Sequence, residues 1–115
     1  MSNQAVRSVY LTAPDLEEAR RLGRALLEER LVACVNLLPG TLSLYRWQGE
    51  LREEPEVVMI AKTRAELVPR LSARVAELHS YEVPCVVAFA VPEGLEPYLD
   101  WVAAETSQVS DFEDG

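Results

Sequence analysis

Residues 31–62 read LVACVNLLPGTLSLYRWQGELREEPEVVMIAK, and they predict two strands joined by a turn. The apolar run Leu31–Leu38 predicts the first strand, which Pro39-Gly40 interrupts with a kink or a bulge. Alternation of apolar and polar side chains resumes over Thr41–Trp47, and Gln48-Gly49 supplies the turn. The first strand is therefore unusually long and apolar.

The second strand of the pair changes character along its length. Residues 50–55 are polar and predict an extension of a hairpin. Val57–Lys62 is a dense apolar run, which is typical of a central strand.

The flanking segments predict two more strands and three helices. Apolar residues at spacings of three and four mark one face in each of the first two helices. Pro69 conflicts with a helix that starts at the capping box Thr63–Glu66, so that helix starts late or has a distorted first turn. The predicted elements are a strand at Val6–Leu11, a helix from the turn Thr12–Asp15 to about Arg30, a helix from Thr63–Glu66 to near His79, a strand at Val83–Val91 and a helix at Leu95–Glu105.

The order strand, helix, strand, strand, helix, strand, helix contains two strand–helix–strand halves. It predicts an α+β fold, the ferredoxin-like split βαβ sandwich with an antiparallel sheet and an added C-terminal helix. We expect one domain over residues 1–106 and an acidic, flexible tail over residues 107–115.

In this topology the second and fourth strands are opposite edges of the sheet. Cys34 and Cys85 then lie on opposite edges, too far apart for an intrachain disulfide. A long apolar edge strand is prone to aggregation unless it is covered. Head-to-tail pairing of the two edges in neighbouring copies would cover both and close a cyclic oligomer.

The amino-acid composition and net charge indicate which kinds of partner the chain is expected to lack. The chain has 115 residues, 49% of them hydrophobic, a net charge of −8 and a single lysine, Lys62. Because no basic cluster is present, we expect neither a nucleic-acid nor a membrane-surface partner. The sequence shows no signal-peptide core and no run of 18 apolar residues, so we expect a cytoplasmic protein whose cysteines are reduced and behave as small buried hydrophobes.

An ordered set of short motifs runs along the chain, namely Thr12–Asp15, Leu31–Asn36, Leu38–Gly40, Ser43–Glu50, Lys62-Thr63, His79–Pro84 and Tyr98–Trp101. Taken together, this set resembles the CutA family of divalent-cation tolerance proteins. The resemblance implies a ferredoxin-like homotrimer, related in architecture to the PII-type signalling proteins. It also implies a link to tolerance of copper and other divalent cations, with no established catalytic activity.

The candidate metal ligands are His79, Glu82 and Cys34. Neutral imidazole suits Cu²⁺, Ni²⁺ or Zn²⁺, and a nearby carboxylate such as Glu82 can be a second ligand. A site needs three or four ligands, so a neighbouring subunit would have to supply the others. Some family members carry Cys at the position of Leu11 or His at the position of Leu78, and this chain lacks both groups. The alternatives are a helix-capping role for His79 and an inert thiol at Cys34.

A second set of residues predicts an intersubunit cleft or interface. Lys62 is the sole lysine and lies in an apolar strand, where a charge is usually paired or faces a cavity. It could pair with Glu82 at a subunit boundary or contact a ligand. Aromatic residues with a polar handle favour an interface. The set consists of Tyr45, Trp47, Lys62, Tyr81, Tyr98 and Trp101.

Three functions remain open at this stage. The first is copper or other divalent-metal binding by a homotrimeric tolerance protein. The second is a PII-like small-molecule sensor with its ligand in the intersubunit cleft near Lys62, Glu82 and Tyr98. The third is a trimeric scaffold for a protein partner. The isolated glycines, the single histidine and the lack of a catalytic motif predict that the chain is not an enzyme.

Overall fold

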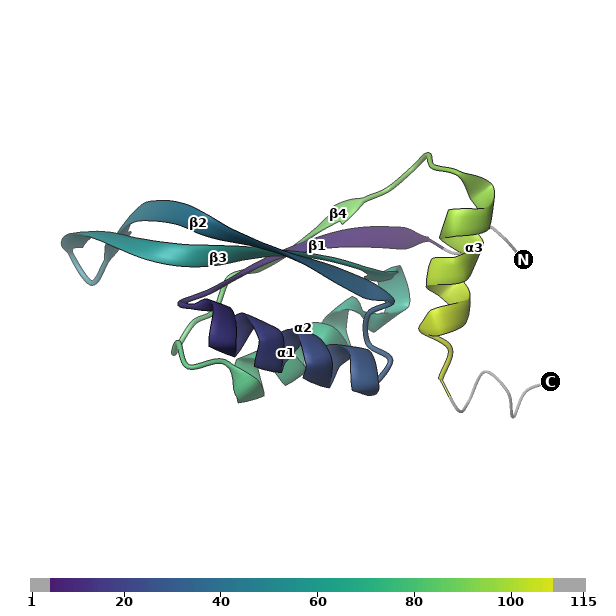
Figure 1. Cartoon of the computed structure of the whole chain (residues 1–115), viewed down its shortest axis with the longest axis horizontal. Helices are drawn as coiled ribbons and strands as arrows, with labels where there is room; N and C mark the ends of the chain where they lie inside the picture. The colour runs from purple at the N-terminus through teal and green to yellow at the C-terminus, as the bar shows by residue number, and fades with distance from the viewer. Residues whose placement is uncertain (1–4, 109–115) are drawn as a thin grey trace.

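The computed structural model describes residues 5–108, which form an antiparallel sheet with two helices packed on one face and a third helix at one end (Figure 1). The predicted α+β split βαβ fold is confirmed. The elements are β1 (Val6–Ala13), α1 (Leu16–Glu28), β2 (Cys34–Trp47), β3 (Glu50–Arg64), a 3₁₀ turn η1 (Ala65–Leu67), α2 (Val68–Leu78), β4 (Val86–Ala90) and α3 (Glu96–Glu105).

The four strands of the described chain lie in the order β2-β3-β1-β4, and all neighbours are antiparallel. The predicted edge strands, β2 and β4, are therefore confirmed. Cys34 begins β2 and Cys85 directly precedes β4, so the two thiols lie at opposite edges, as predicted. Both are half-buried rather than members of the core.

One face of the sheet forms the hydrophobic core with α1 and α2. Every second residue of the central strands points to this face, because strand side chains alternate. The fully buried members include Leu11 of β1, Met59 of β3, Leu22 of α1 and Leu71 of α2. Gly23 lets α1 approach the sheet, since a Cβ there would lie 3.1 Å from Cγ1 of Val35.

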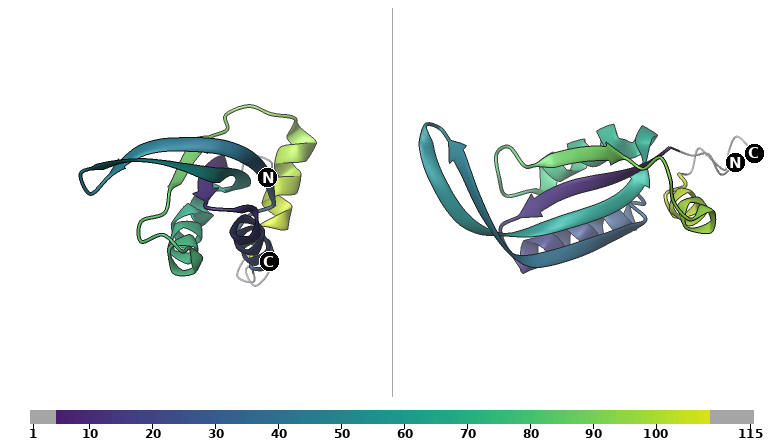
Figure 2. Two further views of the ribbon diagram at one scale, coloured as in Figure 1. Left: turned by 60° about the vertical axis from the view of Figure 1, so that its left-hand side comes forward. Right: turned by 90° about the horizontal axis from the view of Figure 1, so that it is seen from above.

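The other face of the sheet is not covered by helices α1 and α2 (Figure 2). Register places Asn36, Ile60, Tyr10 and Val87 in one row across the four strands on this open face. Several large apolar side chains here are exposed, among them Leu38 at 44%, Val87 at 46% and Phe89 at 55%.

Strands β2 and β3 continue past the rest of the sheet as a curved two-stranded arm (Figures 1 and 2). Leu38 pairs with Val58 but Thr41 pairs with Glu56, so β2 has one extra residue at this point. This is a β-bulge, and Gly40 within it has a positive φ of 92°, which glycine adopts at no steric cost. The predicted kink at Pro39-Gly40 is confirmed.

Two predicted boundaries are wrong at the start of β2 and β4. Residues 31–33 are buried but not strand, because the N–H of Leu31 bonds to the carbonyl of Leu26 and terminates α1. The fourth strand begins at Val86 rather than Val83, and Pro84 in the preceding loop has no N–H to donate.

The predicted capping box at Thr63–Glu66 is also wrong. Thr63 is a buried residue of β3, and its hydroxyl donates to the carbonyl of Leu31 at 2.7 Å. The helix starts late, at Val68, so Pro69 falls in the first turn, where its missing N–H costs nothing. In α1 the side chain of Asp15 caps the helix by accepting from the N–H of Glu18 at 2.8 Å.

The predicted flexible tail at residues 107–115 lies largely outside the described residues. Ser107 and Gln108 are described, and both make hydrogen bonds, Ser107 to the carbonyl of Ala103 and Gln108 to that of Arg30.

Candidate functional site

His79 follows the last residue of α2, and its side chain is fully buried. Nε2 donates to the carbonyl oxygen of Thr12 at 2.7 Å, and Nδ1 accepts from the N–H of Tyr81 at 3.0 Å. These two bonds fix the Nε2–H tautomer, because a carbonyl can only accept and a backbone N–H can only donate. Both ring nitrogens thus have partners within the chain, and neither offers a free lone pair to a metal ion.

Glu18 at the start of α1 supports this arrangement. Its Oε2 accepts from the N–H of Ser80 at 2.9 Å and lies 3.4 Å from Nδ1 of His79. Arg21 donates to the carbonyl of Leu78 from the same helix face. The end of α2 and the loop that follows are therefore fixed to α1 and β1, which sets the position of Tyr81 and Glu82.

A cavity of about 610 Å³ lies on the open side of the sheet, at the base of the β2–β3 arm. Its wall comes from β1, β2, β3 and the loop before β4. Four aromatic residues line it, namely Tyr10, Tyr45, Trp47 and Tyr81. Three carboxylates, those of Glu54, Glu56 and Glu82, and one guanidinium, that of Arg52, also line it.

Glu56 is the most buried of the three carboxylates that line this cavity. Only 8% of it is exposed, and its carboxylate accepts from the hydroxyls of Ser43 at 2.7 Å and Tyr81 at 2.8 Å. The hydroxyl of Tyr45 donates to Glu54 at 3.1 Å. Glu56 and Glu54 are thus held in place by neutral O–H donors rather than by cations, which leaves their negative charge in the cavity.

The phenol of Tyr81 and the thiol of Cys85, which lie beside these carboxylates, stay protonated. Burial, together with the hydrogen bond to Glu56, raises the pKa of Tyr81 well above its usual range. Burial, followed by the charge of Glu56, raises the pKa of the Cys85 thiol. Tyr81 is therefore a stable donor, and Cys85 is a thiol rather than a thiolate at neutral pH.

The β-bulge decides which side chains of β2 reach the cavity. A one-residue shift moves every later side chain to the other face of a strand. Because of the bulge, Ser43, Tyr45 and Trp47 face the same side as Tyr10, while Leu42 alternates away. Sequence reasoning missed Ser43, Arg52, Glu54, Glu56 and Cys85. The available signal was the alternation after Pro39-Gly40, which places polar and aromatic residues on one face of the arm.

A second cluster lies at the other end of the sheet, beside α3. The Sγ atom of Cys34 and the hydroxyl of Tyr98 are 3.3 Å apart, and the ring of Tyr98 lies 5.6 Å from that of Trp101. The contact with Cys34, then burial, raises the pKa of Tyr98 to about 12. Lys62 is directly opposite Cys34 in the register of β2 and β3. The predicted cleft set therefore divides in two, with Tyr45, Trp47 and Tyr81 at the cavity and Lys62, Tyr98 and Trp101 at this end.

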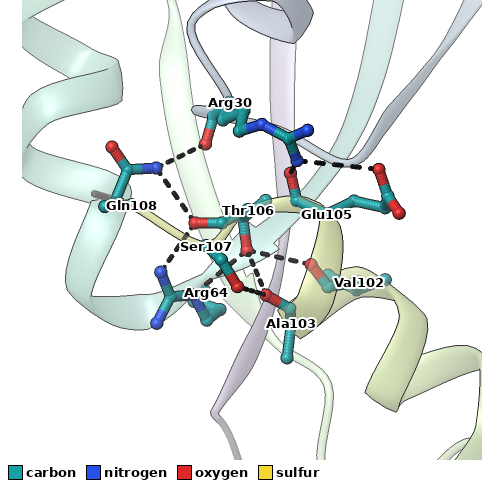
Figure 3. A network of polar contacts seen from close by, with 8 residues as sticks. All are labelled: Arg30, Arg64, Val102, Ala103, Glu105, Thr106, Ser107 and Gln108. Carbon is teal, nitrogen blue, oxygen red and sulfur yellow. Dashed lines mark hydrogen bonds and ion pairs between the residues drawn. The ribbon is translucent and has the colours of Figure 1, made fainter. Parts of the chain in front are cut away.

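The position of α3 depends on a buried arginine (Figure 3). Nε and Nη2 of Arg64 donate to the hydroxyl and carbonyl of Thr106, at 3.0 and 2.7 Å. The hydroxyl of Thr106 in turn donates to the carbonyl of Val102 at 2.9 Å. Arg30 adds a bond from its Nη1 to the carbonyl of Glu105 at 3.0 Å. These contacts fix the C-terminal end of α3 against the sheet.

The three predicted metal ligands do not meet in one chain. Cys34 is in the same row as Ser8, whereas His79 contacts Thr12. Four residues of strand correspond to about 13 Å. Within residues 5–108 no group of three or more His, Cys, Asp and Glu side chains is placed to hold a metal ion. The same separation keeps Lys62 from pairing with Glu82 inside the chain.

In the part of the chain that the structure describes, no helix has the length and apolar character needed to cross a membrane.

Comparison with known sequences identifies close relatives. The chain is 48% identical over 98 residues to the divalent-cation tolerance protein CutA of Thermus thermophilus, which covers 85% of this chain and 95% of the relative. It is 44% identical over 107 residues to human protein CutA, covering 93% of this chain and 60% of the human protein. The chain therefore spans about three fifths of the length of that relative.

Solved structures agree with the sequence comparison. The divalent cation tolerance protein of Thermus thermophilus superimposes with a TM-score of 0.86 at 46% identity, covering 89% of this chain and 99% of that chain. CutA1 of Oryza sativa gives a TM-score of 0.89 at 34% identity, covering 95% and 99%. The structure from Archaeoglobus fulgidus, described as a periplasmic divalent cation tolerance protein, gives 0.86 at 39% identity, covering 89% and 99%.

The family profile called CutA1 divalent ion tolerance protein matches residues 7–105, which is nearly all of the described chain. With relatives of this identity and coverage, the chain belongs to the CutA1 family of divalent ion tolerance proteins.

Proposed function

We propose that this chain acts in divalent-cation tolerance as a non-catalytic homotrimer whose subunits pack through the open faces of their sheets. The observation that carries the proposal is the open face itself. Leu38 on β2 and Val87 and Phe89 on β4 are exposed there at the two edges of the sheet, and α1 and α2 cover only the opposite face. Large apolar side chains that are exposed together on one face of a domain are typical of an interaction site.

The edges of the sheet support assembly from copies of the same chain. The outer edges of β2 and β4 have no strand partner within the described chain. Pairing β2 of one copy with β4 of the next satisfies both edges, and a heterologous contact of this kind closes into a ring. The number three is the expectation drawn from the family resemblance.

The role toward cations follows from the family and is limited by the geometry. Cu²⁺ or another divalent cation needs three or four ligands at fixed distances. Within one chain His79 is fully hydrogen-bonded and Cys34 is remote from it. We therefore propose that a bound cation takes ligands from more than one subunit, with Glu82 as the candidate ligand of this chain that lines an open cavity.

Mass measurement combined with metal titration tests this proposal. We expect a mass three times that of one chain by sedimentation or native mass spectrometry, and saturable Cu²⁺ binding in the same sample. Val87→Asp places a charge on the open face and should dissociate the assembly and remove the saturable binding together. Leu27→Asp is the matched control, because Leu27 is similarly exposed but lies on α1, away from the open face. A wild-type chain that stays monomeric at every concentration contradicts the proposal.

The cytoplasm remains our expected location. Among the relatives, one is described as periplasmic and one, from Arabidopsis thaliana, as chloroplastic. Fractionation of cells that make the full chain tests the expectation directly.

A second candidate function is small-molecule sensing, and the cavity favours it. A volume of about 610 Å³ is in the range of ligand sites in proteins. Its wall combines aromatic rings with a few ordered polar groups, which is the usual composition of such sites. Ligand binding there does not require a metal.

A further inference from the structure

We propose that the cavity at the base of the β2–β3 arm binds a small organic cation, an amine carried on an apolar body. The inference rests on the second candidate function, ligand binding at this cavity, and names the class of ligand. It depends on the charge of the wall, on the aromatic groups and on the way the carboxylates are held.

The wall of the cavity is negative. Three carboxylates and one guanidinium line it, which gives a formal charge of −2 at neutral pH. Nη2 of Arg52 lies 3.4 Å from Oε1 of Glu50, a carboxylate that does not line the cavity. Arg52 therefore neutralises the three cavity carboxylates only in part. Carboxylates that share an apolar cleft favour a cationic ligand and repel an anionic one.

The carboxylates are placed to receive a donor. Glu56 is 8% exposed and takes hydrogen bonds from Ser43 and Tyr81, and each is a neutral hydroxyl. A carboxylate has about four lone-pair positions, so two bonds leave it able to accept from an ammonium group. Glu54 takes one bond, from Tyr45, and is exposed.

The remaining wall suits the body of such a ligand. Tyr10, Tyr45, Trp47 and Tyr81 present aromatic rings around the carboxylates. Aromatic faces attract cations as well as apolar groups, and the attraction is greatest for Trp. A hydrated divalent ion would make no use of these rings, and the described residues provide no three-ligand group to strip its water. The chemistry of the wall therefore favours an organic amine over a bare metal ion.

Trp47 gives a direct signal for the test. The chain has two tryptophans, Trp47 and Trp101, so Trp101→Phe leaves the cavity residue as the only one. The full chain with this substitution is titrated with benzylamine, benzyl alcohol and benzoate, which share a ring but differ in charge. We expect saturable quenching by benzylamine, with affinity about tenfold above that for benzyl alcohol, and none by benzoate.

Variants that replace a carboxylate by an amide test which glutamates contribute to benzylamine binding. Glu54→Gln and Glu82→Gln should each weaken benzylamine binding several-fold and leave benzyl alcohol unchanged. Glu53→Gln is the matched control, because Glu53 neighbours Glu54 on β3, points to the other face of the arm and does not line the cavity. Circular dichroism of each variant confirms that it folds.

The negative outcomes separate the two proposals. Binding of benzyl alcohol or benzoate as tight as that of benzylamine shows that the cavity takes ligands but overturns the cationic class. No response of Trp47 to any of the three compounds, as when a second copy of the chain fills the cavity, overturns both ligand binding there and the cationic class.

Discussion

The two faces of the sheet use the same strands but differ in what covers them. On β3, Met59 is fully buried beneath α1 and α2, while the next residue, Ile60, points to the open face and is only half-buried. On β1, Leu11 is fully buried and Tyr10 is 36% exposed. The chain completes one hydrophobic layer by itself and leaves the other incomplete. Stability of the single chain is therefore a property of the helix side, and the open side is where we propose assembly and ligand binding.

The largest expected effect on stability comes from a substitution on the face of the sheet that α1 and α2 cover. Met59→Ala removes a fully buried side chain and should lower the free energy of unfolding by about 2–5 kcal/mol. Chemical denaturation measures this loss, which should not depend on protein concentration.

Ile60→Ala is the matched substitution on the open face. Because a second copy covers Ile60 in the proposed trimer, its cost should appear as weaker assembly at low protein concentration. Equal, concentration-independent losses for both variants would mean that the two faces do not differ as described.

A smaller effect concerns the corner of the open face where α3 contacts the edge strand β2. There the hydroxyl of Tyr98 on α3 contacts Cys34. The contact, then burial, raises the pKa of Tyr98 to about 12 from the ordinary value of 10.0. Because the folded pKa is raised, the stabilisation is fully present below pH 10 and is lost as the pH rises toward 12.

Ultraviolet titration of tyrosinate measures this shift. In Cys34→Ala the ionisation of Tyr98 should move down toward the ordinary tyrosine value, since its largest cause is removed. Tyr98→Phe identifies which transition belongs to this residue. An unchanged transition in Cys34→Ala would show that burial alone holds the proton, and that α3 does not depend on this contact.

The sequence alone predicted those helices and strands whose apolar residues follow a regular spacing. The apolar spacing of α1, the run Val57–Lys62 and the strand order followed from local pattern and topology rules. Thr63–Glu66 fitted a capping box by residue type, yet pairing with β1 extends β3 through Arg64. Tertiary pairing overrode the local signal there.

The candidate site was harder to predict, because its residues are far apart in the sequence and meet only through the pairing register of the strands. Glu56 and Tyr81 are 25 positions apart and share a hydrogen bond. Ser43 reaches the same carboxylate only because one extra residue at the bulge reverses the faces of β2. His79 was visible as a lone histidine, but the partners that occupy both its nitrogens come from β1 and its own loop.

The smallest expected effect lies at the tip of the β2–β3 arm, which extends past the helices, so that neither face of it is covered. Gln48 and Gly49 form the two-residue turn, and both have positive φ, 51° and 81°. Glycine accepts this conformation at no cost, and asparagine does so more readily than glutamine. Gln48→Asn should raise the free energy of unfolding by roughly 0.5 kcal/mol, and Gly49→Ala should lower it by about 1 kcal/mol. Thermal unfolding at fixed concentration measures both. Because the arm extends past the core, neither substitution should alter the packing of Met59, and a loss as large as that of Met59→Ala would place the arm within the cooperative core instead.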